Sequence, residues 1–97
     1  MSEEMPELDD SFFERALKRS DRKRFIAGDF RSGEDIAALR RYVCLTQVQF
    51  SEALGISVHT LRNWEQGRRM PEGPAIALLR TAARHRRMIR ENLRSAA

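Results

Sequence analysis

The amino-acid sequence predicts an all-α fold, and three observations support this prediction. Apolar side chains recur at intervals of three and four residues in several separate segments, as on the buried face of a helix. Such segments open at Ser11, Ser32 and Thr46, each followed three positions later by an acidic or amide side chain, a pattern that caps helix N-termini. Glycines, among them Gly55 and Gly67, stand where the helical spacing breaks off, because glycine ends a helix without steric cost.

The first third of the chain combines an acidic arm with one predicted amphipathic helix. Residues 1–10 are polar and acidic. The helix is predicted to start at Ser11 and to run up to a basic cluster at Lys18–Arg24, with these residues at helical spacing: Phe12, Phe13, Ala16, Leu17 and Ser20. The basic cluster either complements the negative C-terminal pole of this helix or contacts nucleic acid.

A loop containing Gly28 and Gly33 is predicted next. It carries three large apolar side chains, Phe25, Ile26 and Phe30, which should not be left in water. Two explanations remain open: these side chains fold back on the core, or a partner covers them.

The following helix opens at Ser32, and its apolar positions lie at Ile36, Leu39 and Val43. We expect it to be the first helix of a bundle. Cys44 stands at its end. The chain has a single cysteine and two histidines, which excludes an internal disulfide and argues against a structural zinc site. Cys44 is therefore interpreted as a half-buried small residue rather than a redox group.

The stretch from Leu45 to Arg69 predicts two short helices joined by a tight corner. The first begins at Thr46, whose side chain and that of Gln49 can satisfy each other's backbone N–H groups. Gly55 ends it, and Ser57 caps the second helix only two residues later. So short a connection forces a steep crossing, as in a helix-turn-helix.

The two faces of this pair differ in chemistry. Core positions are predicted at Phe50, Leu54, Ile56, Leu61 and Trp64. A mostly hydrogen-bonding stripe faces outward from the second helix, at Val58, His59, Arg62, Asn63 and Gln66. Such a stripe suits insertion into a DNA major groove. For His59 the alternative is an exposed histidine without a role.

After the second helix, the loop at Arg68–Arg69 either grips phosphates beside the groove or is simply solvated. Gly73–Pro74 opens a further helix, since proline is tolerated in a first turn. Its predicted core residues are Ala75, Ile76, Leu78, Leu79 and Ala82. The last segment, Arg80–Arg94, carries six Arg and a narrow apolar stripe at Met88, Ile89 and Leu93, which forms either a dimer contact or local core.

Charge is distributed unevenly along the chain. Residues 1–14 carry six acidic groups and no Lys or Arg, whereas the rest of the chain holds all 18 Lys and Arg against 8 Asp and Glu. This asymmetry indicates nucleic acid as the partner of the basic body and a basic partner for the arm, unless the arm only aids solubility. The chain lacks the roughly 20 continuous apolar residues of a membrane span and the pattern of a signal peptide, so a cytoplasmic location is expected.

Catalysis is not expected. Ninety-seven residues are too few for a large cleft plus its scaffold. Ser57, His59 and Glu65 cannot form a triad, because side chains at those spacings on one helix point in different directions. No catalytic residue, cofactor or metal ligand is assigned.

The predicted helix-turn-helix and the segments beside it resemble the Xre/Cro-like helix-turn-helix family, and within it the HigA-like antitoxins. The resemblance runs from about Glu34 to Arg80. It rests on LTQ at Leu45–Gln47, LG at Leu54–Gly55 and TLRNWEQGRRMPEGPAIALLR at Thr60–Arg80. It implies a five-helix, lambda-repressor-like bundle with an N-terminal helical extension. Residues 1–33 would form the arm and amphipathic helix, and residues 34–97 the DNA-binding and dimerisation domain.

The resemblance also implies roles for individual residues. Gln47 and Thr60 would touch the phosphate backbone, Val58, His59 and Asn63 would face base edges, and Arg40 would pair with Glu65. An Arg held by a carboxylate is pre-oriented to donate its remaining N–H groups to a phosphate. Cys44 and Val58 depart from the family pattern, and Val58 suits a thymine methyl. The predicted DNA-contacting set is Arg40, Gln47, Ser57, Val58, His59, Thr60, Arg62, Asn63, Arg68 and Arg69.

The function expected from this resemblance is a dimeric, sequence-specific repressor that is also the antitoxin of a RelE/HigB-like mRNA-cleaving toxin and regulates its own operon. Two-fold symmetry implies a palindromic operator with half-sites about 34 Å apart. The predicted toxin-binding residues are Phe12, Phe13, Leu17, Phe25, Ile26 and Phe30. Two alternatives remain: a solitary or phage-type Xre regulator without a toxin, and a small helical adaptor that never meets DNA.

Overall fold

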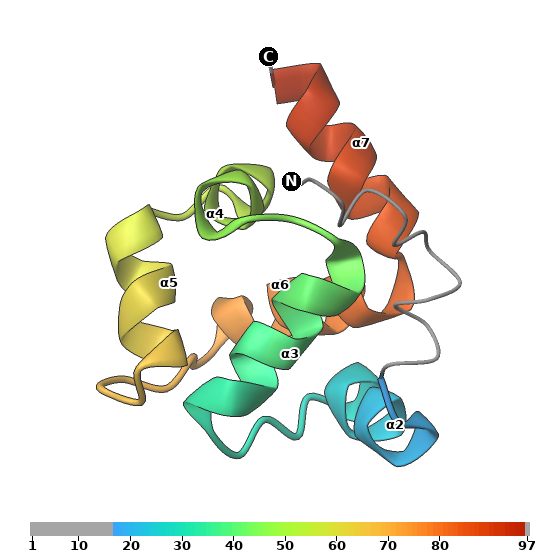
Figure 1. Cartoon of the computed structure of the whole chain (residues 1–97), viewed down its shortest axis with the longest axis vertical. Coiled ribbons are helices and arrows are strands. Elements are labelled where there is room, and N and C mark those ends of the chain that lie inside the picture. Colours follow the sequence, from blue (N-terminus) through green and yellow to red (C-terminus); the bar gives the residue numbers. More distant parts are fainter. Residues whose placement is uncertain (1–16, 97) are drawn as a thin grey trace, which may run out of the picture.

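The computed structural model describes the backbone of residues 17–96 and the side chains of residues 17–92. This part of the chain holds six helices and no strand (Figure 1). None of these helices is long and apolar enough to cross a membrane. The start of the predicted helix at Ser11 lies outside the described residues. The helices are α2 (Arg19–Ala27), α3 (Gly33–Val43), α4 (Gln47–Leu54), α5 (Val58–Glu65), α6 (Pro74–Arg84) and α7 (Arg86–Ala96).

Helix α2 corrects two predictions. Lys18 is its N-cap, so the basic cluster opens a helix instead of closing one. Phe25 and Ile26, predicted in a loop, form the last turn of α2. The helix continues to Gly28, whose φ of 86° is the left-handed conformation that closes a helix. The glycine that suggested a loop is therefore a helix C-cap.

The apolar residues around α2 mainly pack on the core, the first of the two explanations left open by the sequence. Phe25 is fully buried, so its assignment as a toxin-binding residue is wrong. Phe30 stacks on it with ring centroids 5.1 Å apart, and Leu17 and Ile26 are partly buried against the same core. Helix α2 packs against α6 (Figure 1). The described residues hold six helices, so the predicted five-helix count is not matched exactly. Helices α3 to α7 lie in the segment assigned to the bundle, and α2 precedes it and packs on α6.

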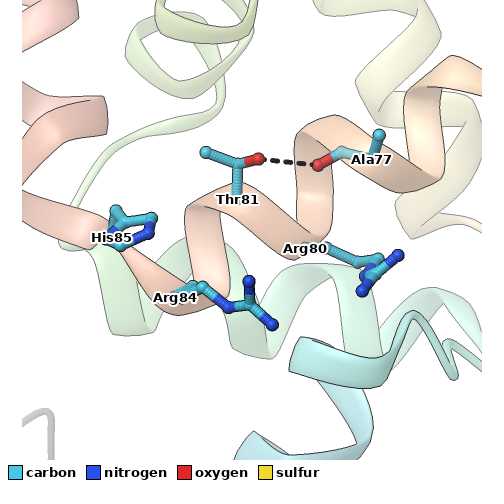
Figure 2. A pocket seen from close by; sticks show the side chains of 5 residues that line it. All are labelled: Ala77, Arg80, Thr81, Arg84 and His85. Atoms are coloured by element: carbon cyan, nitrogen blue, oxygen red, sulfur yellow. Dashed lines mark hydrogen bonds between the residues drawn. The ribbon is translucent and has the colours of Figure 1, made fainter.

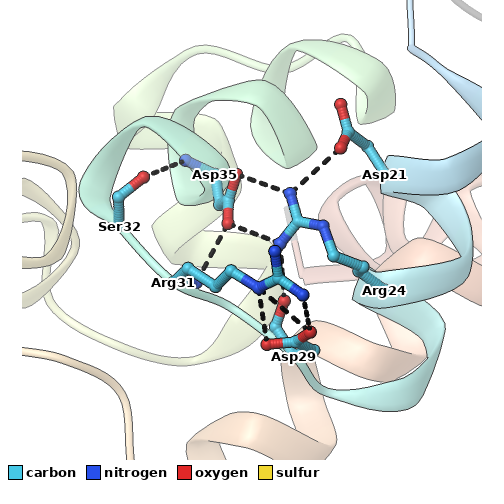
Figure 3. Close-up of polar contacts among 6 residues, drawn as sticks. All are labelled: Asp21, Arg24, Asp29, Arg31, Ser32 and Asp35. Carbon is cyan, nitrogen blue, oxygen red and sulfur yellow. Dashed lines mark hydrogen bonds and ion pairs between the residues drawn. The ribbon is translucent and has the colours of Figure 1, made fainter.

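An arginine joins α2 to the start of α3 (Figure 3). The Arg24 guanidinium donates to both carboxylate oxygens of Asp35, at 2.9 and 3.1 Å, and to Asp21 at 3.0 Å. Its hydrogen bonds hold the pKa of the Asp35 carboxyl below its usual range. The contribution of this pair to stability is therefore present near neutral pH and is lost in acid, once Asp35 takes up a proton.

Helix α3 begins and ends as the sequence predicts. Ser32 accepts a hydrogen bond from the backbone N–H of Asp35. Cys44 is half-buried and takes the left-handed conformation at the C-cap, with φ 71°. It is the only residue other than glycine with positive φ in the described part of the chain. The predicted apolar positions Ile36, Leu39 and Val43 are all fully buried.

The C-terminal helix α7 is bonded to the ends of α3 and α4. Arg86 donates to the carbonyl of Tyr42 at 3.4 Å and lies over the Tyr42 ring, and Arg90 donates to the carbonyl of Val43 at 3.2 Å. Asn92 donates to the carbonyl of Ala53 at 2.6 Å. These carbonyls belong to the last turns of their helices, where intrahelical partners are lacking. Arginine side chains on α7 thus serve the internal structure.

The apolar stripe of the last segment divides between core and surface. Ile89 is buried in the core, whereas Met88 is 53% exposed. The side chain of Leu93 lies outside the described residues. On α6, Leu79 and Ala82 are buried as predicted, but Leu78 is 37% exposed. A dimer contact through these helices stays a prediction.

Candidate nucleic-acid interface

The helix pair at the centre of the sequence has the predicted caps. Thr46 and Gln49 form the reciprocal capping box, with both hydrogen bonds at 3.1 Å. Gly55 adopts φ 76° and ends α4, and the Ser57 hydroxyl accepts from the Thr60 N–H at 3.0 Å at the start of α5. Two separate helices therefore meet at a short corner, as a helix-turn-helix requires.

Helix α5 is anchored on one side and open on the other. Leu61 is fully buried and Trp64 is 6% exposed. His59, Arg62 and Gln66 are exposed on the opposite side, and Val58 and Asn63 are half-buried. In Figure 1, α5 lies at the left edge of the molecule, with α3, α4 and α6 on one side of it. The outward stripe predicted from helical spacing is therefore accessible in the folded protein.

A hollow of about 490 Å³ lies between α5 and the loop that follows it. It is lined by His59, Thr60, Asn63, Trp64, Arg69, Met70 and Glu72. The imidazole of His59 and the carboxamide of Asn63 on α5 line it together with the guanidinium of Arg69 on the loop. These donors and acceptors suit contacts with both base edges and phosphates. Arg68 is exposed on the same loop.

The ion pair implied by the family resemblance is present. Arg40 on α3 donates from Nε to Glu65 on α5 at 2.7 Å and from Nη2 at 3.3 Å. The two side chains are only 18% and 8% exposed. Arg40 also donates from Nη1 to the carbonyl of Leu45 at 3.1 Å, so each of its guanidinium nitrogens serves an internal bond. Its further contact with a phosphate stays a prediction.

Gln47 makes two bonds that the sequence did not indicate. Its Nε2 donates to Glu65 at 3.0 Å, and its Oε1 accepts from Nε of Arg62 at 3.2 Å. These partners lie 18 and 15 residues away in the sequence, so no local spacing indicates the contact. Gln47 thus bonds to Arg62 in the folded chain, and its contact with a phosphate stays a prediction.

Gly33 was interpreted as a loop residue, but it is the buried first residue of α3. A Cβ atom added there would lie 2.2 Å from the carbonyl oxygen of Glu65 and 2.7 Å from that of Trp64. Only glycine permits this close approach of α3 to the end of α5. The sequence contains no local signal for it, since the contact joins two distant segments.

A second, smaller hollow of about 190 Å³ lies along α6 and is lined by Ala77, Arg80, Thr81, Arg84 and His85 (Figure 2). Arg80 donates to the carbonyl of Ile26 at 2.9 Å, and Thr81 donates to the carbonyl of Ala77 at 2.9 Å. Arg80 therefore joins α6 to the end of α2. Two arginines of the predicted last segment, Arg80 and Arg84, thus line this hollow and lie away from α5.

The folded chain and its exposed second helix define a helix-turn-helix domain, a class whose second helix enters the DNA major groove. Residues 36–81 match the family described as Helix-turn-helix. Over 54 residues the chain is 39% identical to Antitoxin HigA-2 of Vibrio cholerae serotype O1. These matches confirm the resemblance to Xre-family, HigA-like antitoxins.

The similarity to Antitoxin HigA-2 covers 56% of this chain and 52% of that protein. The chain thus spans about half the length of the curated relative it matches. No solved structure matches the chain.

Proposed function

We propose that this protein is a sequence-specific DNA-binding repressor that reads a duplex with α5 and also acts as an antitoxin. The observation that carries the DNA part is the asymmetry of α5. Buried Leu61 and Trp64 fix its orientation, and exposed His59 and Arg62 leave its other side accessible to a major groove.

The residues proposed to contact DNA fall into two groups. Val58, His59 and Asn63 face base edges, whereas Arg68 and Arg69 contact phosphates. Ser57 and Thr60, which also bond to each other, lie at the N-terminal start of α5 beside the backbone of the duplex. Because phosphate contacts release counterions, binding should weaken steeply as salt rises.

The antitoxin part rests on the relative named Antitoxin HigA-2 and on charge. Residues 1–14 carry six acidic groups without a Lys or Arg, which suits a basic partner. We propose a RelE/HigB-like mRNA-cleaving toxin as that partner, and autoregulation of the operon that encodes both. With Phe25 in the core, the proposed toxin-binding segment begins with Phe12 and Phe13, which lie outside the described residues, and continues through half-buried Leu17. Ile26 and Phe30 are partly buried and would lie at the edge of this segment.

A dimer through α6 and α7 would place two copies of α5 on successive half-sites of a palindrome. The exposed apolar side chains of Leu78 and Met88 support this arrangement. A regulator without a toxin would need the same DNA contacts. Only a test of toxin binding therefore separates an antitoxin from a solitary regulator.

Removing the base-reading side chains tests the DNA part. We expect His59→Ala and Asn63→Ala each to lower affinity for the operator upstream of the gene by about 1–3 kcal/mol, because a base-edge contact is lost. Affinity for random duplex should change little, as titrations of both duplexes would show.

Arg68→Ala is the matched control, because a phosphate contact carries no sequence information. It should weaken binding to the operator and to random duplex alike. It should also reduce the slope of log binding constant against log salt concentration by about one unit. If His59→Ala and Asn63→Ala also weaken both duplexes equally, α5 does not read bases.

Deleting residues 1–16 tests the antitoxin part. The deletion leaves Phe25 and the rest of α2 in place, which a deletion of residues 1–33 would not. In coexpression with the product of a small basic reading frame beside the gene, the full chain should copurify with that product. The shortened chain should not, because the acidic groups are gone.

The same shortened chain should bind the operator normally, and Asn63→Ala should keep the toxin while binding the operator more weakly. Absence of copurification for the full chain would favour the solitary regulator. Retention of the toxin by the shortened chain would instead contradict the role of the acidic arm.

A further inference from the structure

Four side chains form a continuous hydrogen-bonded series from the interior of the bundle to the exposed face of α5. Arg40 donates to Glu65 at 2.7 Å, Gln47 donates to Glu65 at 3.0 Å, and Arg62 donates to Gln47 at 3.2 Å. The inner pair is largely buried, whereas Arg62 is exposed. The series therefore connects a fixed interior group with a cation on the open surface of α5.

The orientation of the Gln47 amide is determined by its neighbours. A carboxylate only accepts hydrogen bonds, so Nε2 must face Glu65. A guanidinium only donates, so Oε1 must face Arg62. A flipped amide would lose both bonds. Because Glu65 is held by Arg40 as well, Gln47 presents an acceptor to Arg62 in one position only.

This bond determines which edge of Arg62 is available to a ligand. Nε is occupied by Gln47. Within the described part of the chain, no hydrogen bond involves Nη1 or Nη2 of Arg62. Those two nitrogens form a planar fork of parallel donors, the geometry that matches O6 and N7 of guanine in the major groove. The bond to Gln47 also restricts the rotamers of a long side chain before binding, which lowers the entropic cost of ordering it.

We propose that Arg62 specifies a guanine in the operator through its Nη1–Nη2 fork, and that Gln47 is the residue that positions it. Arg62 lies one turn after Val58 on the outward stripe of α5, at the side facing α4. This inference rests on the proposed function, since it identifies a base that the DNA-binding face recognises. It assigns Gln47 an action through Arg62 in addition to any phosphate contact of its own.

The experiment uses a duplex selected from a random double-stranded library by the full wild-type chain. Each guanine of that duplex is then replaced in turn by 7-deazaguanine, which lacks the N7 acceptor and keeps normal pairing. Wild-type protein should lose affinity about tenfold at the guanine that Arg62 contacts, because a charge-assisted hydrogen bond is removed. The Arg62→Ala variant should bind the original and the substituted duplex equally at that position.

Two further variants separate positioning from contact. His59→Ala should retain the full tenfold response at the Arg62 guanine. Gln47→Ala should reduce that response while leaving the responses at other guanines unchanged, a selective effect that a loss of folding would not produce.

The inference is overturned if Arg62→Ala weakens selected and random duplexes alike and keeps every response to 7-deazaguanine, since Arg62 would then contact a phosphate. A response of Gln47→Ala that is uniform over all guanines would overturn the positioning role. If the wild-type chain enriches no sequence, the proposed DNA-binding function itself fails, and the guanine contact with it.

Discussion

Gly33→Ala is expected to lower the free energy of unfolding by about 3 kcal/mol, more than an alanine at any other glycine of the helix-turn-helix region. The added Cβ would lie 2.2 Å from the carbonyl oxygen of Glu65, far inside van der Waals contact. The neighbour is backbone, so no side chain can rotate out of the way. Helix α3 and the end of α5 must therefore separate, and urea unfolding of both proteins measures the loss.

Gly55→Ala provides the matched control. Nothing lies within 4 Å of a Cβ at Gly55, so only its φ of +76° opposes the substitution. That conformation costs an L-residue roughly 1–2 kcal/mol. Equal losses for the two variants would mean that the approach of α3 to α5 is not maintained in solution. Gly33→Ala should also weaken operator binding, because Glu65 and Trp64 belong to α5, the helix proposed to read the duplex.

Arg40→Ala should destabilise the fold by about 3 kcal/mol, because it leaves the Glu65 carboxylate without its cation. Glu65 is 8% exposed, so its carboxylate is largely removed from solvent, and Gln47 would remain as its side-chain donor. The expected loss combines the penalty of an unpaired buried charge with the loss of the bond from Arg40 to the carbonyl of Leu45. Thermal and urea unfolding would both show it.

The adjacent residue, Arg41, offers a control with the same side chain on the same helix. Arg41 donates to Glu34 at 2.7 Å, the same distance as the closest Arg40–Glu65 contact. The two partners are 52% and 76% exposed, however, so Arg41→Ala should cost less than about 1 kcal/mol. If the two variants lost equal stability, burial would not be the cause of the Arg40 effect.

Local chemistry made much of the fold predictable from the sequence. A cap depends on residues within one turn of each other, so the patterns at Ser32, Thr46 and Ser57 indicated helix starts that the structure confirms. The period of apolar residues likewise indicated that Leu61 and Trp64 face inward. Because the outward face of α5 is the complement of this buried face, its accessible residues could be predicted with it.

Features that depend on distant segments could not be predicted in this way. The approach of Gly33 to Glu65 and the bond from Arg62 to Gln47 join residues from different helices, and neither leaves a local pattern. The placement of Phe25 was wrong for a related reason. Gly28 can belong to a loop or close a helix, and the choice is made by the contacts of α2 with α6.

The bonds from α7 to the ends of α3 and α4 have a consequence for regulation. Arg86, Arg90 and Asn92 join α7 to the last turns of α3 and α4, the helices that pack against α5. We therefore expect a rotation of α7 to displace α5 as well. A molecule that binds α7 in a rotated position is therefore expected to change the affinity of α5 for its proposed DNA duplex. By thermodynamic reciprocity, the duplex will change the affinity for that molecule by the same factor.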